Sequence, residues 1–263
     1  MSSTARPAVD LPTIVGWGML LMPLLTMWHE IGGHAAACAL LGGPVETIGA
    51  FYVQCRASGE TAQIIVALAG VTVNALLALV AHALWARSRS DSVRLPLWLV
   101  WVSEAFVATG YFCFSGATGF GDLGTGSGGA LAMLPHPLLI RAAEFAIGVL
   151  AYIVLARLAI RTLHTMLGTG SATRTARRRV AHGYYATCGI AAVLVGLLNP
   201  VGVLITIMSA AASSFGGLAG FISIGFADGA PNTANPFTLP RSWPVIALGA
   251  IALSGFAFVL GPR

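Results

Sequence analysis

Lysine is absent from this sequence, and charged residues of every kind are scarce. They make up 9% of the 263 residues, while 57% are hydrophobic; soluble domains carry about 25% charged residues. All fourteen basic residues are arginines, and no basic stretch is interleaved with aromatic residues as in a nucleic-acid-binding surface. These absences argue against a soluble domain and a nucleic-acid partner. They indicate an integral membrane protein surrounded by a lipid bilayer.

A C-x-x-C pair is also missing. The four cysteines are scattered, and three of them lie in apolar runs; they are Cys38, Cys55, Cys113 and Cys188. This pattern predicts neither a disulfide framework nor a cysteine zinc site. We expect the four side chains to be packing residues.

Six segments are long and apolar enough to cross a bilayer as helices of about 20 residues. They lie near 12–41, 61–86, 95–115, 138–164, 184–210 and 243–260. The first lacks the cleavage site of a signal peptide and is expected to be retained. β-Branched and aromatic residues between glycines in 45–60 predict a short β-hairpin after the first span. The expected fold class is an all-α, multi-pass membrane protein with about six transmembrane helices.

The arginines are distributed unevenly around these six spans. The larger group falls on one side and consists of Arg6, Arg87, Arg89, Arg94, Arg161, Arg174, Arg177, Arg178, Arg179 and Arg263; Arg56 and Arg241 fall on the other side. Arginine-rich loops stay in the cytoplasm, so both termini are expected there. The arginine-rich segment 168–183 is predicted to be a loop that sets this orientation. The expected location is a bacterial inner or plasma membrane.

The first span contains three ionisable residues within the stretch WHEIGGH, namely His29, Glu30 and His34. Ionisable groups inside a membrane are costly, and three together predict a functional site. The zinc-protease signature H-E-x-x-H places its histidines four residues apart, whereas these are five apart. A separation of five turns the second side chain by about 140° on a regular helix. A π-type turn absorbs one extra residue, and Gly32 and Gly33 allow the backbone to deform or a neighbouring helix to approach. The H-E-x-x-G-H pattern also resembles that of the dipeptidyl peptidase III family of soluble zinc enzymes.

A catalytic zinc ion needs three protein ligands and one open position. The stretch SGATGFGDLGTGSGG at 115–129 contains Asp122 among seven glycines, so it cannot form a regular helix. Irregular backbone at membrane depth lines a cavity or is buried in protein, which makes Asp122 the candidate third ligand. The alternative is a helix N-cap at the membrane surface.

The second span places Gly70 and Asn74 four residues apart, which alone is ordinary helix packing. With HEIGGH before them and FGDLG after them, however, the order resembles that of the site-2 protease family of intramembrane zinc metalloproteases. The resemblance covers about 12–130. It implies Zn²⁺ held by His29, His34 and Asp122, with Glu30 as general base. It also implies substrate binding by Asn74 and Gly70, and a membrane-protein or membrane-peptide substrate.

The resemblance also implies an organisation of the chain. An N-terminal tail would occupy 1–11, a three-span metalloprotease core 12–130, and three further spans without a counterpart in the family 131–263. The motifs depart from the family pattern, with the inserted glycine, Val71 in place of a proline, and Asp122 preceded rather than followed by glycine. A catalytically silent relative that binds or chaperones membrane proteins is therefore an alternative. A metal or small-molecule transporter is another, although the inverted repeats typical of transporters are not visible.

Two further acids lie within the predicted spans. Glu104 has no evident partner in sequence and is a reserve metal ligand or proton-relay residue. Glu144 follows Arg141 by three residues, so a structural ion pair is expected there.

Overall fold

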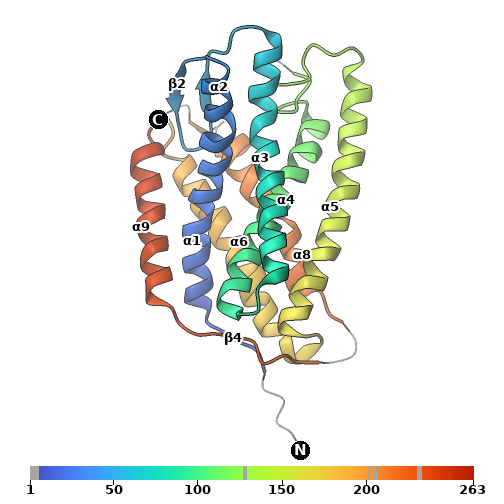
Figure 1. Ribbon diagram of the computed structural model, residues 1–263, viewed down its shortest axis with the longest axis vertical. Helices are drawn as coiled ribbons and strands as arrows, with labels where there is room; N and C mark the ends of the chain where they lie inside the picture. Colours follow the sequence, from blue (N-terminus) through green and yellow to red (C-terminus); the bar gives the residue numbers. More distant parts are fainter. Residues whose placement is uncertain (1–5, 127–128, 201, 204–205, 230–232) are drawn as a thin grey trace, which may run out of the picture.

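The computed structural model describes residues 6–126, 129–200, 202–203, 206–229 and 233–263. Long helices run side by side along one axis, and a small hairpin lies at one end of the bundle (Figure 1). The predicted all-α, multi-pass membrane fold is confirmed. Among the described residues, six helical segments are long and apolar enough to cross a membrane: Leu11–Leu40, Glu60–Arg87, Asp91–Thr118, Pro137–Leu167, Ser209–Phe226 and Trp243–Leu260.

The first span is one continuous helical rod with a change of winding in its middle. It consists of α1 (Leu11–Met27), the π-helix η1 (Trp28–Ala35) and α2 (Ala36–Leu40). Asp10 caps its start by accepting a hydrogen bond from the Thr13 backbone N–H at 3.0 Å, which satisfies one of the free amides of the first turn. Two uninterrupted helices follow, α3 (Glu60–Arg87) and α4 (Asp91–Thr118), and α4 packs between α3 and the next long helix, α5 (Pro137–Leu167).

The fifth predicted span, 184–210, and the predicted arginine loop, 168–183, are both misplaced. After the short 3-10 turn η2 (Ser171–Thr173), α6 already begins at Arg174 and ends at Gly196. The apolar segment lies further on, in the π-helix η3 (Thr206–Gly216) and α8 (Gly220–Phe226). The helix can start among arginines because Arg174, Arg177 and Arg179 have hydrogen-bond partners. Arg177 is fully buried and contacts Asp228 at 2.5 Å, and Arg179 donates to the Val9 carbonyl at 2.9 Å.

The first described residues, from Arg6, and the C-terminus lie at opposite ends of the bundle (Figure 1). At one end, β1 (Ala8–Val9) pairs in parallel with β4 (Thr238–Leu239), just before the last helix, α9 (Trp243–Leu260). At the other end, the Ala50 N–H donates to the Leu260 carbonyl at 3.1 Å. The prediction of both termini on one side is therefore wrong, because α6 runs along the bundle in addition to the six apolar segments.

The predicted hairpin is confirmed as β2 (Val45–Ile48) paired antiparallel with β3 (Val53–Cys55). A disulfide joins Cys38 in α2 to Cys55 in β3, so the prediction of packing cysteines is wrong for this pair. The hairpin folds back over the end of the first span, which brings together two residues 17 apart in sequence. Cys113 and Cys188 are free thiols.

The two ends of the bundle carry different elements. The hairpin end carries β2, β3 and the segments 119–126 and 129–136, which lie between α4 and α5 in sequence. The arginine end carries β1, β4 and the connections 88–90 and 168–173 (Figure 1). Between the two ends, the outer faces of α5 and α9 expose large apolar side chains such as Leu150, Ile251 and Phe258, as expected for surfaces in contact with lipid.

Candidate metal centre

The π-helix η1 brings the two histidines of the motif onto one face. Eight residues, Trp28–Ala35, adopt this wider winding, so the π-type turn expected from the five-residue spacing is present. The Nε2 atoms of His29 and His34 lie 3.1 Å apart, and the ring centroids lie 4.8 Å apart. The winding thus corrects the rotation that a regular α-helix would impose.

Two glycines allow α3 to approach this face of η1. A Cβ atom added to Gly33 would lie 2.6 Å from the Cα of Gly70, closer than such contacts occur. A Cβ atom on Gly70 would lie 2.6 Å from the Nε2 atoms of both His29 and His34. Gly70 therefore leaves open the space into which both imidazoles point. Its predicted contact with substrate stays a prediction.

Asp122 reaches the same point from the end of α4. The helix ends where Gly119 adopts φ 79°, a left-handed conformation that glycine accepts easily. The chain then turns back on itself, with the Gly126 N–H donating to the Gly119 carbonyl at 2.9 Å. This turn places the Asp122 carboxylate Oδ2 3.3 Å from the Nε2 atoms of both His29 and His34. The alternative role as an N-cap does not apply, because the next helix begins only at Pro137.

The three atoms form a nearly equilateral triangle with sides of 3.1, 3.3 and 3.3 Å. Donors bound to zinc at about 2.0–2.1 Å with tetrahedral angles lie about 3.3 Å from one another. The triangle therefore fits three corners of a zinc coordination sphere. His29 and His34 are buried, Asp122 is 25% exposed at its side chain, and all three side chains line one cavity.

In each neutral imidazole, the hydrogen bond made by Nδ1 determines whether Nε2 carries the lone pair. His34 Nδ1 donates to the Val66 carbonyl at 2.7 Å, so the neutral form of this imidazole carries its lone pair on Nε2. The Asn74 amide nitrogen donates to Glu104 Oε2 and to the Gly70 carbonyl, both at 3.2 Å, which turns the amide oxygen towards His29 Nδ1 at 3.1 Å. Asn74 thereby holds His29 in the same tautomer, the usual role of a residue behind a metal ligand.

The electrostatics of the trio follow from these tautomers. Two imidazole lone pairs and one carboxylate oxygen converge within 3.3 Å, an arrangement that repels itself unless a cation or proton occupies the centre. Burial raises the pKa of Asp122, but when protons occupy the centre His29 and His34 donate to the carboxylate, and these hydrogen bonds hold its pKa well below its ordinary value. The carboxylate is therefore ionised and available as a ligand.

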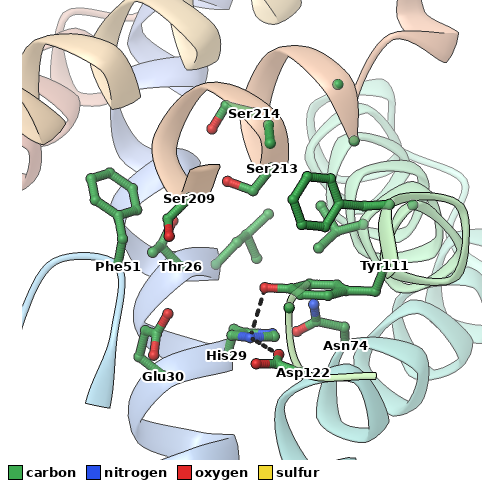
Figure 2. Close-up of a pocket in the computed structure, with 18 of the residues that line it drawn as sticks. Thr26, His29, Glu30, Phe51, Asn74, Tyr111, Asp122, Ser209, Ser213 and Ser214 are labelled. Carbon is green, nitrogen blue, oxygen red and sulfur yellow. Dashed lines mark hydrogen bonds and ion pairs between the residues drawn. The ribbon is translucent and has the colours of Figure 1, made fainter. Parts of the chain in front are cut away.

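Glu30 lies beside His29 and is buried at 6% exposure (Figure 2). Its carboxylate oxygen Oε2 has no hydrogen-bond partner among the described residues. Both Glu30 and the ligand trio line a cavity of about 870 Å³. An unpartnered carboxylate beside a metal-binding trio is placed to exchange protons with a molecule in that cavity.

The cavity is enclosed by both halves of the chain. Residues from the hairpin and from α3 and α4 form part of its lining, including Phe51, Val53 and Cys55. On the side opposite the trio, η3 contributes Ser209, Ser213 and Ser214 (Figure 2). The region 131–263, which had no assigned role, therefore supplies a polar wall through η3.

Tyr111 is a site residue that the sequence analysis missed. Its ring stacks on His29 with centroids 5.0 Å apart, and its hydroxyl lies 3.0 Å from His29 Nε2 (Figure 2). Because that nitrogen carries a lone pair, the hydroxyl donates. A signal was present, since Tyr111 follows Glu104 by seven residues and so shares its helical face.

The two further acids do not join the trio. Glu104 is buried and contacts Asn74, which in turn contacts His29. Glu104 is therefore connected to the candidate ligands only through Asn74. The expected contact pair of Glu144 with Arg141 is not formed. Arg141 instead donates to the Gly116 and Ala117 carbonyls at the end of α4, at 3.1 and 2.5 Å. Those carbonyls end a helix and need donors, which explains the preference.

No protein-family model, curated protein or solved structure matches this chain.

Proposed function

We propose that this chain is an intramembrane zinc-dependent endopeptidase, a divergent member of the site-2 protease family. It would act on a membrane-embedded protein in a bacterial inner or plasma membrane. One observation carries the proposal, the convergence of His29 Nε2, His34 Nε2 and Asp122 Oδ2 beside the unpartnered carboxylate of Glu30. A site built only for helix packing has no need of three mutually repelling acceptors.

Two imidazoles and one carboxylate with an open fourth position are the ligand set of a catalytic zinc site. When bound, zinc would supply Lewis acidity to a peptide carbonyl and to the attacking water. Around it, Asn74 and the Val66 carbonyl hold the two imidazoles in their ligand tautomers.

Glu30 is the proposed general base and acid. In the proposal, its free oxygen takes a proton from the attacking water and later delivers that proton to the leaving amine. Burial at 6% exposure removes competing water molecules from the carboxylate, which favours transfer within the site.

Tyr111 is the proposed donor to the substrate carbonyl oxygen. In the structure its hydroxyl donates to His29 Nε2, the same lone pair that a metal ion requires. Metal binding would free the O–H to donate into the cavity, where negative charge develops on the substrate oxygen. A fixed donor at such a position contributes about 3 kcal/mol to transition-state stabilisation.

The substrate must present an extended segment, because a helical peptide keeps its carbonyls in its own hydrogen bonds. Strand β3 lies along the cavity, with Val53 and Cys55 in the lining, and its outer edge is available for an added strand. Gly70 keeps the space in front of the imidazoles open for that segment.

The decisive experiment compares the native chain with Glu30→Gln and His29→Ala, using purified protein and single-span membrane proteins as candidate substrates. Native protein should contain one zinc per chain and cleave. Glu30→Gln should keep the zinc and lose cleavage, and His29→Ala should lose both. Equal processing by native protein and Glu30→Gln would contradict the role of Glu30. Stoichiometric zinc without any cleavage would favour the silent binding relative.

A further inference from the structure

A disulfide lies next to the candidate metal centre. Cys38 follows the ligand His34 by four residues, a rise of about 6 Å along the helix, and its partner Cys55 lines the same cavity. Disulfides form and persist in oxidising compartments and are rare where the cytosol keeps thiols reduced. The disulfide therefore indicates that the hairpin end of the bundle lies outside the cytoplasm.

The arginines mark the opposite end. Of the fourteen, only three belong to the hairpin end, where Arg56 follows β3, Arg141 contacts the end of α4, and Arg263 ends the chain near Asn199. The other eleven lie at the arginine end or in the half of a helix that leads to it: Arg6, Arg87, Arg89, Arg94, Arg157, Arg161, Arg174, Arg177, Arg178, Arg179 and Arg241.

Contacts at the arginine end confirm this grouping. Arg241 pairs with Asp10 at 3.2 Å, Arg179 bonds to the Val9 carbonyl, and the Thr238 N–H donates to Asp91 at 3.3 Å. Segments from the start, middle and end of the chain thus meet there. An arginine excess of this size marks the cytoplasmic side of a membrane protein. The orientation indicated by the arginines agrees with the one indicated by the disulfide, and the two observations are independent.

We infer that the metal centre opens to the extracytoplasmic, oxidising side of the membrane, and that its substrate is a membrane protein cleaved near the outer end of its span. The inference rests on the proposed function for its substrate class and on the disulfide and arginines for its direction. The cavity reaches the hairpin through Phe51 and Tyr52, so a substrate segment enters from the outer surface.

Orientation is tested by thiol labelling of the full-length protein in sealed cells. Met133→Cys places a thiol on an exposed residue of the hairpin end, and Ser90→Cys places one on an exposed residue of the arginine end. A membrane-impermeant maleimide should label Met133→Cys in sealed cells and Ser90→Cys only after permeabilisation. The native chain, with its free Cys113 and Cys188, gives the background. The reverse pattern would overturn the inference.

The redox state gives a second measurement. After acid trapping, Cys38 and Cys55 should accept a maleimide only once a reductant has been added. A pair that is labelled without reduction would contradict an oxidising environment. Glu30→Gln should behave like the native chain in both measurements, so the orientation is decided even if the enzyme proposal fails.

The substrate class is tested by mapping new protein termini in membranes that contain the native chain or Glu30→Gln. Termini that depend on Glu30 should lie at the outer ends of substrate spans. Clustering at the cytoplasmic ends would overturn the inference. A complete lack of Glu30-dependent termini would count against the protease proposal, while the labelling result would still stand.

Discussion

At the scale of single residues, the orientation of the two histidines depends on the hydrogen bond that each Nδ1 atom makes. Val66 and Asn74 accept the two Nδ1–H groups, which commits both Nε2 lone pairs to the position facing Asp122. Removing such an orienting partner usually lowers metal affinity about 10- to 100-fold. The carbonyl of Val66 cannot be removed by substitution, so Asn74 is the position at which this support can be weakened.

Gly70→Ala should weaken zinc binding while leaving the helix intact. Its methyl carbon would lie 2.6 Å from the Nε2 atoms of both histidines, in the volume that the ion needs. Metal analysis of purified protein measures the effect, and at least a tenfold loss of zinc affinity is expected. Gly255→Ala is the matched control, because a Cβ atom there meets nothing within 4 Å. Full zinc content in Gly70→Ala would contradict the proposed position of the ion.

Tyr111→Phe should retain zinc and lose about 100-fold in kcat, because it removes only the hydroxyl proposed to stabilise charge on the substrate oxygen. Tyr185→Phe is the control, since its hydroxyl donates to the Phe215 carbonyl away from the trio. An unchanged kcat in Tyr111→Phe would remove the residue from the mechanism.

The residues that sequence alone identified are those whose presence in a membrane is costly. His29, Glu30 and His34 stand out because ionisable groups need a reason to be in a span, and Asp122 stands out among glycines. Tyr111 and the η3 serines carry no such cost, because hydroxyl groups are common in packed membrane helices. Only the folded chain shows that their oxygens reach the same cavity.

At the scale of elements, the close contact of η1 with α3 depends on Gly33 more than on Gly32. Gly33→Ala should lower the free energy of unfolding by about 1–3 kcal/mol, because its Cβ atom would meet the Gly70 backbone at 2.6 Å. Gly32→Ala should have a smaller effect, since its Cβ atom would meet only the Trp28 side chain at 3.2 Å. Unfolding in detergent, followed by circular dichroism, compares the two. Equal effects would contradict the close helix crossing.

The start of α6 is held to the segment before β4 by an ion pair. Hydrogen bonds from Arg174 and Arg177 hold the pKa of Asp228 below its ordinary value. The ionised carboxylate therefore stabilises the fold above a pH of about 4, and this contribution is lost as pH falls through the lowered pKa. Asp228→Asn should lower the melting temperature at pH 7 and flatten its decrease on acidification. Parallel pH profiles for the two proteins would contradict this.

The boundaries of most helices follow from composition, and the exception has a physical cause. Apolar runs bounded by polar residues predict the first four spans and the last one closely. The segment 168–196 misleads because arginines normally end a span, whereas here Arg177 is neutralised by Asp228. That partner lies 51 residues away, which no local pattern can show.

At the scale of the whole molecule, the cavity needs the C-terminal half. Ser213→Leu should leave zinc content unchanged and lower cleavage of a protein substrate, because it fills the wall opposite the trio (Figure 2). Ser223→Leu, on an exposed position of α8, is the control. Unchanged cleavage in Ser213→Leu would mean that substrate does not pass this wall.

The motif resemblance covers only residues 12–130, so it identified the ligands and not the compartment around them. The termini and the disulfide also escaped prediction, because both depend on how distant segments pair at the ends of the bundle. Ala8 with Thr238, and Cys38 with Cys55, become neighbours only after folding.

The serine side chains of η3 make one wall of the cavity polar. A hydrolytic centre that sits among lipid tails has to admit water without letting the bilayer leak or the tails fill the space. In the proposed protease, the η3 serines would help to keep water in the cavity, because they add polar groups to the wall opposite the three candidate ligands. The proposed activity would then depend on the complete cavity as well as on those ligands.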